Sequence, residues 1–213
     1  CTRYITEHLE GVVLEKSFNM LIAQTDGAGA EVLAEKIAQV WRDLGLEVQV
    51  EERGEELLRF RRAMLPALEA KGKVLIEDVA VPISKMGEML QALRDIESQY
   101  GIEIPTVAHA GDGNLHPFFY FDDREPGVIK KVVEAGEEII RKCITLGGSI
   151  TGEHGVGVEK LDAMPLMFTP DDLNYQFKLK AVFDPESTCN PCKVLPNQKS
   201  CNEHRQRWRG TSW

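Results

Sequence analysis

Apolar residues recur every three or four positions in several long stretches of the chain, which is the spacing of one face of an amphipathic helix. The first stretch is followed by glycine, as expected at the end of a helix. Pro66 lies within the second stretch, and we expect Ser84 to cap the third helix. The pattern predicts helices over residues 30–44, 55–69, 84–100, 127–146, 158–167 and 171–182.

Shorter stretches alternate apolar and polar residues, or are continuously apolar between turn residues, which is typical of β-strands. They predict strands over residues 18–25, 46–50, 73–81, 106–111 and 115–121. We therefore expect an α+β fold: a ferredoxin-like antiparallel sheet with helices packed on one face, in two similar halves, followed by C-terminal helices. No linker separates the halves, so we expect one domain over residues 1–195 and a basic tail over residues 196–213.

One short stretch in the second half carries two histidines, in the sequence His109-Ala-Gly-Asp-Gly-Asn-Leu-His116. Asp112-Gly113 is a strong signal for a two-residue hairpin turn, because both central positions of a type I′ turn need a positive φ. Such a turn pairs His109 directly with His116 on one face, with Cβ atoms roughly 4.5–5.5 Å apart. Two facing imidazoles suit a shared metal ion, and the alternative is a hairpin with two incidental histidines.

A glycine-rich loop over residues 147–157 is the second unusual stretch. Its glycines permit positive φ and a close approach of the backbone to other groups, but the loop lacks the residue pattern of a phosphate-binding loop. Glu153 can complete a site of two histidines and one carboxylate with His109 and His116. The adjacent His154 is then a free base beside the metal. The alternative is a surface turn in which both side chains are solvated.

The composition is that of an ordinary globular protein, with 43% hydrophobic and 28% charged residues. A net charge of −9 argues against a general nucleic-acid surface. Residues 193–213 differ, because five basic residues and one acidic residue give this segment +4 and leave −13 for the rest. We interpret the segment as a solvated tail, with a docking strip for an acidic partner as the alternative.

No apolar run reaches the ~20 residues of a membrane-spanning helix, and the start at Cys1 looks like a cut through a longer chain. The five cysteines form an odd set without a secretory signal, which favours a reducing compartment. We therefore expect a cytoplasmic location, with peripheral membrane association through partner subunits as the alternative.

Two readings are open for the cysteines themselves. Cys143 lies in an apolar helical pattern, so we interpret it as a small core residue. Cys189, Cys192, Cys201 and His204 could form a second metal site, although their spacing matches no common zinc module.

Taken together, the motifs resemble the C-terminal half of the FAD-linked oxidases of the vanillyl-alcohol-oxidase type, and in particular members that act on glycolate or D-lactate. The resemblance extends to about Pro196 and includes three further blocks, which are Arg61-Arg62…Pro66, Asp78–Pro82 and Asp184-Pro…Asn190-Pro-x-Lys193. The family has an FAD-binding domain N-terminal to this region. The resemblance therefore implies that this chain is the substrate or cap domain alone, inactive without that domain.

The resemblance also implies roles for single residues. His109, His116 and Glu153 are expected to bind a divalent metal, Zn, Mn or Fe, beside the flavin, with His154 as the catalytic base. Arg61 is expected to hold the substrate carboxylate, in the bidentate manner that a guanidinium allows. The alternatives are a solvated helix charge at Arg61, or the same role for the neighbouring Arg59 or Arg62. In this chemistry the metal lowers the pKa of the substrate hydroxyl, the base takes its proton, and FAD accepts a hydride.

Asn114 and Asn190 are candidates for contacting the flavin or the substrate, with capping or turn roles as the alternative. Phe118 and Ile76 stand where some hydroxyglutarate-acting relatives carry asparagine and lysine, so we expect glycolate or D-lactate as the 2-hydroxy-acid substrate. Other expected partners are the missing FAD-binding domain and further oxidase subunits, including an iron–sulfur subunit. The alternative function is an independent metal-binding or partner-binding module that docks on an iron–sulfur subunit.

Overall fold

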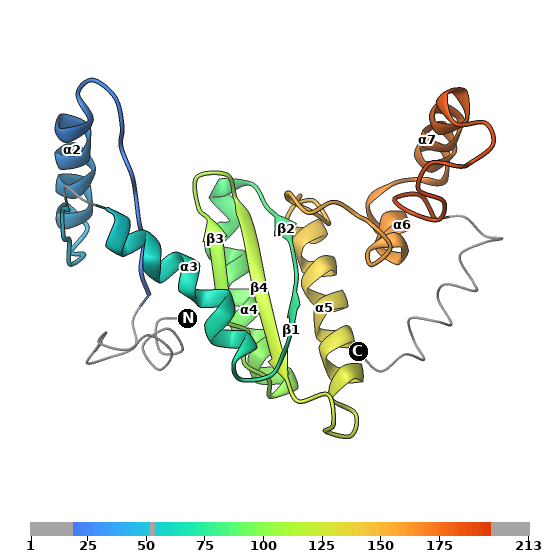
Figure 1. The fold of residues 1–213 in the computed structure, drawn as a ribbon, viewed down its shortest axis with the longest axis horizontal. Helices are drawn as coiled ribbons and strands as arrows, with labels where there is room; N and C mark the ends of the chain where they lie inside the picture. The colour runs from blue at the N-terminus through green and yellow to red at the C-terminus, as the bar shows by residue number, and fades with distance from the viewer. Residues whose placement is uncertain (1–18, 52–53, 197–213) are drawn as a thin grey trace. The chain divides into compact units, whose positions relative to one another are not determined.

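The computed structural model describes residues 19–51 and 54–196 (Figure 1). The chain divides into two compact units, one ending at Lys71 and the other beginning at Gly72. Nearly all of the basic tail lies outside the described residues.

The described residues of the first unit form two helices, α2 (Ala30–Asp43) and α3 (Glu55–Glu69). α2 begins after Gly29, which has a φ of 88°, and Gly45 follows the helix with a φ of 76°. Both helices were predicted from the apolar spacing, and Pro66 lies inside α3 as expected.

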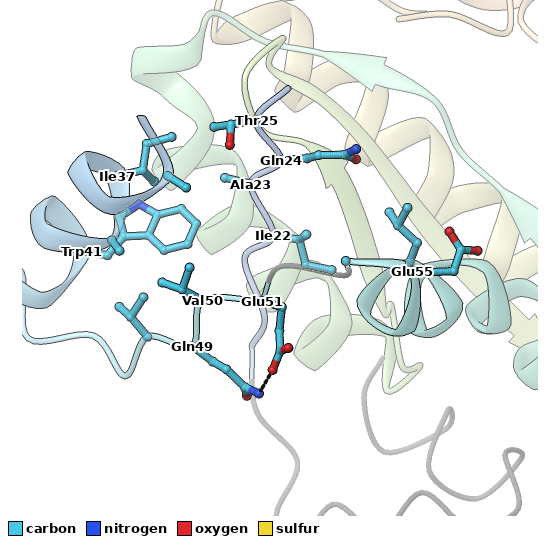
Figure 2. Close-up of a pocket in the computed structure, with 15 residues that line it drawn as sticks. Ile22, Ala23, Gln24, Thr25, Ile37, Trp41, Gln49, Val50, Glu51 and Glu55 are labelled. Atoms are coloured by element: carbon cyan, nitrogen blue, oxygen red, sulfur yellow. Dashed lines mark hydrogen bonds between the residues drawn. The ribbon is translucent and has the colours of Figure 1, made fainter. Parts of the chain in front are cut away.

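The strands predicted over residues 18–25 and 46–50 are wrong as far as they are described, because residues 19–25 and 46–50 belong to no strand ladder. A strand requires main-chain hydrogen bonds to a neighbour, which an alternating pattern of side chains does not supply. Both segments instead line a cavity of about 530 Å³ together with Ile37 and Trp41 of α2 (Figure 2).

The second unit contains all the strands that the structure describes, and each of the other three pairs antiparallel with the central one. They are β1 (Lys73–Ile76), β2 (Val79–Ala80), β3 (Thr106–His109) and the central β4 (Asn114–Phe121). The pairings of β1 and β2 with β4 follow a single register. β1 and β2 are therefore two parts of one strand that is interrupted at residues 77–78. Their combined range, residues 73–80, agrees with the strand predicted over residues 73–81.

The interruption coincides with Pro117 of β4, which lies opposite Glu77 when the register is continued across the gap. The amide of Glu77 donates to the carbonyl of Pro117 at 2.9 Å. Proline has no amide hydrogen with which to return the second bond of this pair. The break leaves two adjacent acidic residues, Glu77 and Asp78, in the middle of a sheet strand, with side chains on opposite faces.

β3 and β4 form the predicted hairpin, but the predicted register is wrong. His109 opposes Asn114, and His116 opposes Val107. The pairing is shifted by two residues from the expected one, and a shift by an even number leaves each side chain on its original face. The two histidines therefore share a face of the sheet as expected, but as diagonal rather than direct neighbours.

The neighbouring strand, rather than the local turn preference, determines the hairpin loop over residues 110–113. Gly113 has a φ of 74°, whereas a type I′ turn would need a positive φ at Asp112 as well. The carbonyl of Gly113 accepts a hydrogen bond from the amide of Val81 at 2.9 Å. A Cβ at Gly113 would overlap the Val81 carbonyl, so this close approach requires glycine.

Helices α4 (Met86–Tyr100) and α5 (Val128–Thr145) pack against one face of the sheet (Figure 1). Every second residue along the strands points to this face, and several of these side chains are fully buried. Both helices contribute side chains to the same core. Its main members are Val79, Leu115 and Phe119 from the strands, Met89, Leu93 and Ile96 from α4, and Val132, Ile139 and Cys143 from α5. The α+β fold with an antiparallel sheet is therefore confirmed.

The start of α4 differs from the pattern-based prediction. A 3₁₀ turn, η1 (Ile83–Lys85), precedes the helix, and Lys85 occupies the N-cap position. Ser84 therefore does not cap α4. The end of the helix is as predicted, with Gly101 at a φ of 63°.

The predicted helix over residues 158–167 is reduced to two short pieces, whereas the next one forms. The two pieces are η2 (Leu161–Ala163) and α6 (Met164–Met167). The helix predicted over residues 171–182 is α7 (Pro170–Phe183). α7 begins with a capping box, in which Thr169 and Asp172 each bind the main chain of the other.

Cys143 is a buried core residue, as predicted. Its thiol donates to the carbonyls of Ala80 at 3.2 Å and Ser149 at 3.3 Å, and burial raises its pKa to about 11. Cys189 is exposed, and Cys201 and His204 lie outside the described residues, so the second metal site is untested. Among the described residues, no helix combines the length and the apolarity that crossing a membrane requires.

Candidate functional site

Three side chains with metal-binding atoms converge beside the β3–β4 hairpin. His109 ends β3, His116 lies in β4, and Glu153 belongs to the glycine-rich loop that follows α5. One potential ligand atom from each lies within 4.8 Å of the other two. Glu153 Oε1 is 3.0 Å from His116 Nε2 and 3.6 Å from His109 Nε2. The structure thus brings together the three residues predicted as metal ligands.

The proposed base, His154, lies against this cluster. Its ring stacks on that of His116, with centroids 5.0 Å apart and planes inclined by 21°. Its Nε2 is 3.8 Å from Glu153 Oε1, and 48% of its side chain is exposed. The ring can therefore meet both the cluster and a molecule that arrives from solvent.

Main-chain pairing connects the glycine-rich loop to the sheet. Ala80 of β2 and Ser149 exchange two hydrogen bonds, of 3.2 and 2.7 Å. A Cβ at Gly148 would overlap the Ala80 carbonyl, and a Cβ at Gly152 would overlap the side chain of Asn114 in β4. Glycine is therefore needed at these two positions for the loop to approach the strands.

A buried carboxylate, Asp78, holds the next part of the loop, and only 1% of this residue is exposed. Its Oδ2 accepts hydrogen bonds from Thr151 Oγ1 at 2.5 Å and from the amides of Gly152, Glu153 and His154 at 2.9, 3.0 and 2.8 Å. Burial opposes ionisation, but these bonds and the charge of a nearby lysine outweigh it and lower the pKa of Asp78. Asp78 is therefore an ionised carboxylate in the protein interior.

His116 provides the test of whether these residues fit a metal. It is 7% exposed, and burial lowers its pKa despite the attraction of the nearby carboxylates, which favours the neutral imidazole that a metal requires. Its Nδ1 is buried without a hydrogen-bond partner among the described residues and lies 3.9 Å from Asp78 Oδ1. Two imidazole nitrogens and one carboxylate are a donor set that Zn, Fe and Mn accept, so the residues fit a divalent metal.

Lys160 joins the same region from the helix-covered side of the sheet, and it is 7% exposed. Its Nζ contacts the carbonyls of Asp78 and Ile150, the latter at 2.9 Å, and lies 3.3 Å from Glu77 Oε2. Burial raises the pKa of Glu77 despite this cation. Lys160 therefore ties the start of the loop to the strand break.

No role for Asp78 or Lys160 follows from the sequence pattern alone. A signal for Asp78 exists, because the acidic pair Glu77-Asp78 interrupts an otherwise apolar strand, and charged groups are rarely buried without partners. Lys160 carries no comparable signal, since its partners are carbonyl groups from distant segments.

The remaining predicted residues have different surroundings. Asn114 is 6% exposed, and its Nδ2 lies 3.4 Å from His116 Nε2, so it belongs to the cluster. Asn190 has a φ of 46° and accepts a hydrogen bond from Lys193 Nζ at 3.2 Å, which fits a turn residue. Arg61 is exposed on α3 of the first unit. Roles for Asn190 and Arg61 in the site stay predictions.

The cavity of the first unit is a separate feature without this chemistry (Figure 2). Its lining is largely apolar and contains neither histidine nor cysteine; Glu51 and Glu55 supply its charges. The His–Glu cluster is therefore the candidate functional site.

Comparisons with known proteins show the family to which the chain belongs. The family model described as "FAD linked oxidases, C-terminal domain" matches residues 5–194. The chain is similar to the glycolate oxidase subunit GlcD of Escherichia coli (strain K12), with 32% identity over 191 residues, or 86% of this chain and 38% of the relative. It is 42% identical over 148 residues to the protein of the same name from Bacillus subtilis (strain 168), or 69% of this chain and 32% of the relative.

A third relative is a D-lactate dehydrogenase of Anaerostipes hadrus, which is 37% identical over 136 residues, or 63% of this chain and 29% of the relative. The chain thus spans between 29% and 38% of the length of these relatives. The family match, by contrast, includes most of the chain together with the hairpin and the glycine-rich loop. The chain therefore belongs to the FAD-linked oxidases, as their C-terminal domain.

Proposed function

We propose that this chain is the substrate- and metal-binding domain of an FAD-dependent 2-hydroxy-acid dehydrogenase or oxidase. The observation that carries the proposal is the convergence of His109, His116 and Glu153, with His154 beside them. Relatives named glycolate oxidase subunit and D-lactate dehydrogenase support a 2-hydroxy acid as the substrate class.

The proposed metal ligands are Nε2 of His109, Nε2 of His116 and Oε1 of Glu153. Three protein ligands leave coordination positions open for a substrate. A bound divalent metal, Zn, Mn or Fe, supplies Lewis-acid chemistry that lowers the pKa of a hydroxyl group. The Glu153 side chain is 51% exposed, so a small molecule can reach the cluster from solvent.

His154 is the proposed general base that takes the proton of the substrate hydroxyl. Imidazole is the side chain that most often serves as a general base. Stacking on His116 fixes the plane of the ring, and its Nε2 lies at the edge of the ligand set, 3.8 Å from Glu153 Oε1.

Arg61 is the proposed partner of the substrate carboxylate, because a guanidinium binds a carboxylate with two parallel hydrogen bonds. The neighbouring Arg62 forms an ion pair with Glu55 of the same helix. That pairing favours Arg61 as the guanidinium that meets the substrate.

The strands beside the cluster favour a small monocarboxylate such as glycolate or D-lactate. Phe118 lies two residues after His116 on the same face of β4, is 5% exposed and opposes Ile76 of β1. A second substrate carboxylate at this apolar pair would lose its hydration without gaining a partner, which is costly.

FAD supplies the redox chemistry of the proposed reaction, and we propose that it is held mainly by a separate domain. Asn114 is the residue of this chain that best fits a contact with the flavin or the substrate. Its Oδ1 is buried without a hydrogen-bond partner among the described residues and is therefore available as an acceptor. Asn190 is the second, weaker candidate. Other oxidase subunits, including an iron–sulfur subunit, are proposed partners.

The test uses the intact protein that contains this chain, with its bound metal measured by mass spectrometry and its flavin by absorbance. Anaerobic addition of glycolate or D-lactate should bleach the flavin, whereas D-2-hydroxyglutarate should act poorly. Retained bleaching in a His116→Ala variant that has normal metal content would overturn the proposal.

A further inference from the structure

The inference concerns Asp78, a buried carboxylate that belongs to none of the proposed ligands. It lies in the break between β1 and β2, which Pro117 of the neighbouring strand creates. A charged group with 1% exposure is costly inside a protein unless hydrogen bonds and opposite charge compensate it. The bonds that compensate Asp78 all come from the loop that carries Glu153 and His154.

Three consecutive amides, those of Gly152, Glu153 and His154, point at Oδ2 of Asp78, and the hydroxyl of Thr151 donates to the same atom. Consecutive amides that converge on one anion form a concave nest in the backbone. Because the backbone of residues 152–154 is bound on this side, the positions from which Glu153 and His154 extend are determined by Asp78.

Asp78 also faces one of the proposed ligands directly. When the register of β1 and β2 is continued across the break, Asp78 lies opposite His116. Oδ1 of Asp78 is 3.9 Å from His116 Nδ1, the nitrogen that points away from Glu153. A metal-binding histidine usually presents its other nitrogen to a carboxylate or carbonyl, which orients the ring.

Lys160 binds the main chain of the same residue from the opposite side of the sheet. It contacts the carbonyl of Asp78 and the carbonyl of Ile150, two residues before the first amide of the nest. The strand break and the loop are thus joined twice, once by an anion on the cluster side and once by a cation on the helix side.

We propose that Asp78 is a positioning residue of the candidate metal centre. Oδ2 anchors the backbone of Glu153 and His154, whereas Oδ1 accepts a further bond from the amide of Glu153 at 3.3 Å and orients the imidazole of His116, so that a single side chain sets the geometry of two ligands and the base. This inference rests on the proposed function, because it assigns Asp78 a role toward that metal.

The decisive variant is Asp78→Asn in the full chain. Asparagine can keep an acceptor oxygen toward the loop amides, but it lacks the charge and places an amide group where Oδ1 faces His116. The expected result is a 10- to 100-fold weaker affinity for metal, the range found when partners of metal ligands are removed. Asp172→Asn is the matched control, because Asp172 accepts hydrogen bonds from the main chain and side chain of Thr169 at a surface helix start.

The measurement is a titration with Co²⁺, whose visible absorption reports both affinity and coordination geometry, together with circular dichroism of the metal-free chain. We expect Asp78→Asn to retain its folded spectrum, to bind Co²⁺ at least 10-fold more weakly and to change the shape of the absorption bands. Asp172→Asn should bind Co²⁺ as the unmodified chain does. Unchanged affinity and bands in Asp78→Asn would overturn the inference.

Two further variants cover the other outcomes. If Asp78→Asn does not fold, Thr151→Val removes one donor to Asp78 and should weaken Co²⁺ binding, whereas Thr151→Ser should restore it; equal binding by all three chains would overturn the inference. His116→Ala separates the two claims. If His116→Ala abolishes binding while Asp78→Asn leaves it unchanged, the positioning role is wrong and the metal centre stands; if His116→Ala binds normally, the metal centre itself is wrong.

Discussion

The carboxylate of Glu153 lies 3.0 Å from Nε2 of His116, although one residue comes from a loop after α5 and the other from strand β4. Oε1 of Glu153 is also 3.6 Å from Nε2 of His109, so three potential ligand atoms surround one point. The contact exists because the loop pairs with β2 through Ser149 and is bound by Asp78. The candidate site is therefore built by adjacent main-chain segments rather than by long, flexible side chains.

Removing a proposed ligand should remove the metal. His109→Ala and His116→Ala should each weaken Zn²⁺ or Mn²⁺ binding by more than about 100-fold. Removing a residue that only hydrogen-bonds to a metal ligand already lowers metal affinity by about 10- to 100-fold, and a ligand itself contributes more. Isothermal titration of the metal-free chain measures the effect. Lys130→Ala, a change on the exposed surface of α5, is the control and should leave binding intact.

His154 should affect the reaction but not the metal. In the intact protein, His154→Gln should slow flavin reduction by 2-hydroxy acids by ~100- to 10,000-fold, since a general base contributes about that much to a rate. Stopped-flow absorbance measures flavin reduction, and mass spectrometry checks that bound metal is unchanged. A variant that reduces its flavin at the normal rate would exclude His154 as the base.

Arg61 and Arg62 form a matched pair on α3. Arg61→Ala should raise the KM for glycolate or D-lactate by ~10- to 150-fold, because hydrogen bonds between charged groups are worth about 1.5–3 kcal/mol. Arg62→Ala loses only an exposed ion pair with Glu55 and should leave KM within about two-fold. Equal effects of the two substitutions would remove Arg61 from the substrate site.

Asp184 should make the stability of the fold depend on pH in the acid range. Its carboxylate accepts hydrogen bonds from Lys180 Nζ at 2.6 Å and from the amides of Thr188 and Cys189, and these lower its pKa from 3.8 to about 2. A carboxyl whose pKa is lower in the folded state stabilises the fold above its unfolded pKa, and this stability is lost as pH falls from about 4 to about 2.

The test for Asp184 is urea unfolding of Asp184→Asn and the unmodified chain at several pH values. The variant should be less stable at pH 6, and the difference should shrink as the pH approaches 2. Asp184 directly follows α7, and Asp171 lies in the first turn of that helix. Asp171→Asn therefore controls for the loss of one negative charge. A difference that stays constant between pH 6 and pH 2 would contradict the assignment.

The sequence by itself determined the segments that become α2, α3, α4, α5 and α7, because a helix satisfies its own main-chain hydrogen bonds and needs only an apolar stripe to pack. The helix predicted over residues 158–167 is the exception. The sequence also predicted that His109 and His116 share a face of the hairpin, and this holds for any loop with an even number of residues, because a register shift by two residues leaves each side chain on its face. The residue types of the candidate site, two histidines followed by an adjacent glutamate and histidine, were equally visible in the sequence.

Only the tertiary structure decided how these parts meet. The hairpin register depends on the bond between Val81 and Gly113, the strand break on the missing amide of Pro117, and the loop position on the buried charge of Asp78. Each is a contact between segments far apart in the chain, and the local sequence pattern of one segment does not specify which distant segment packs beside it. The strands expected over residues 18–25 and 46–50 are absent from their described residues for the same reason, because a strand needs a partner, whereas a helix does not.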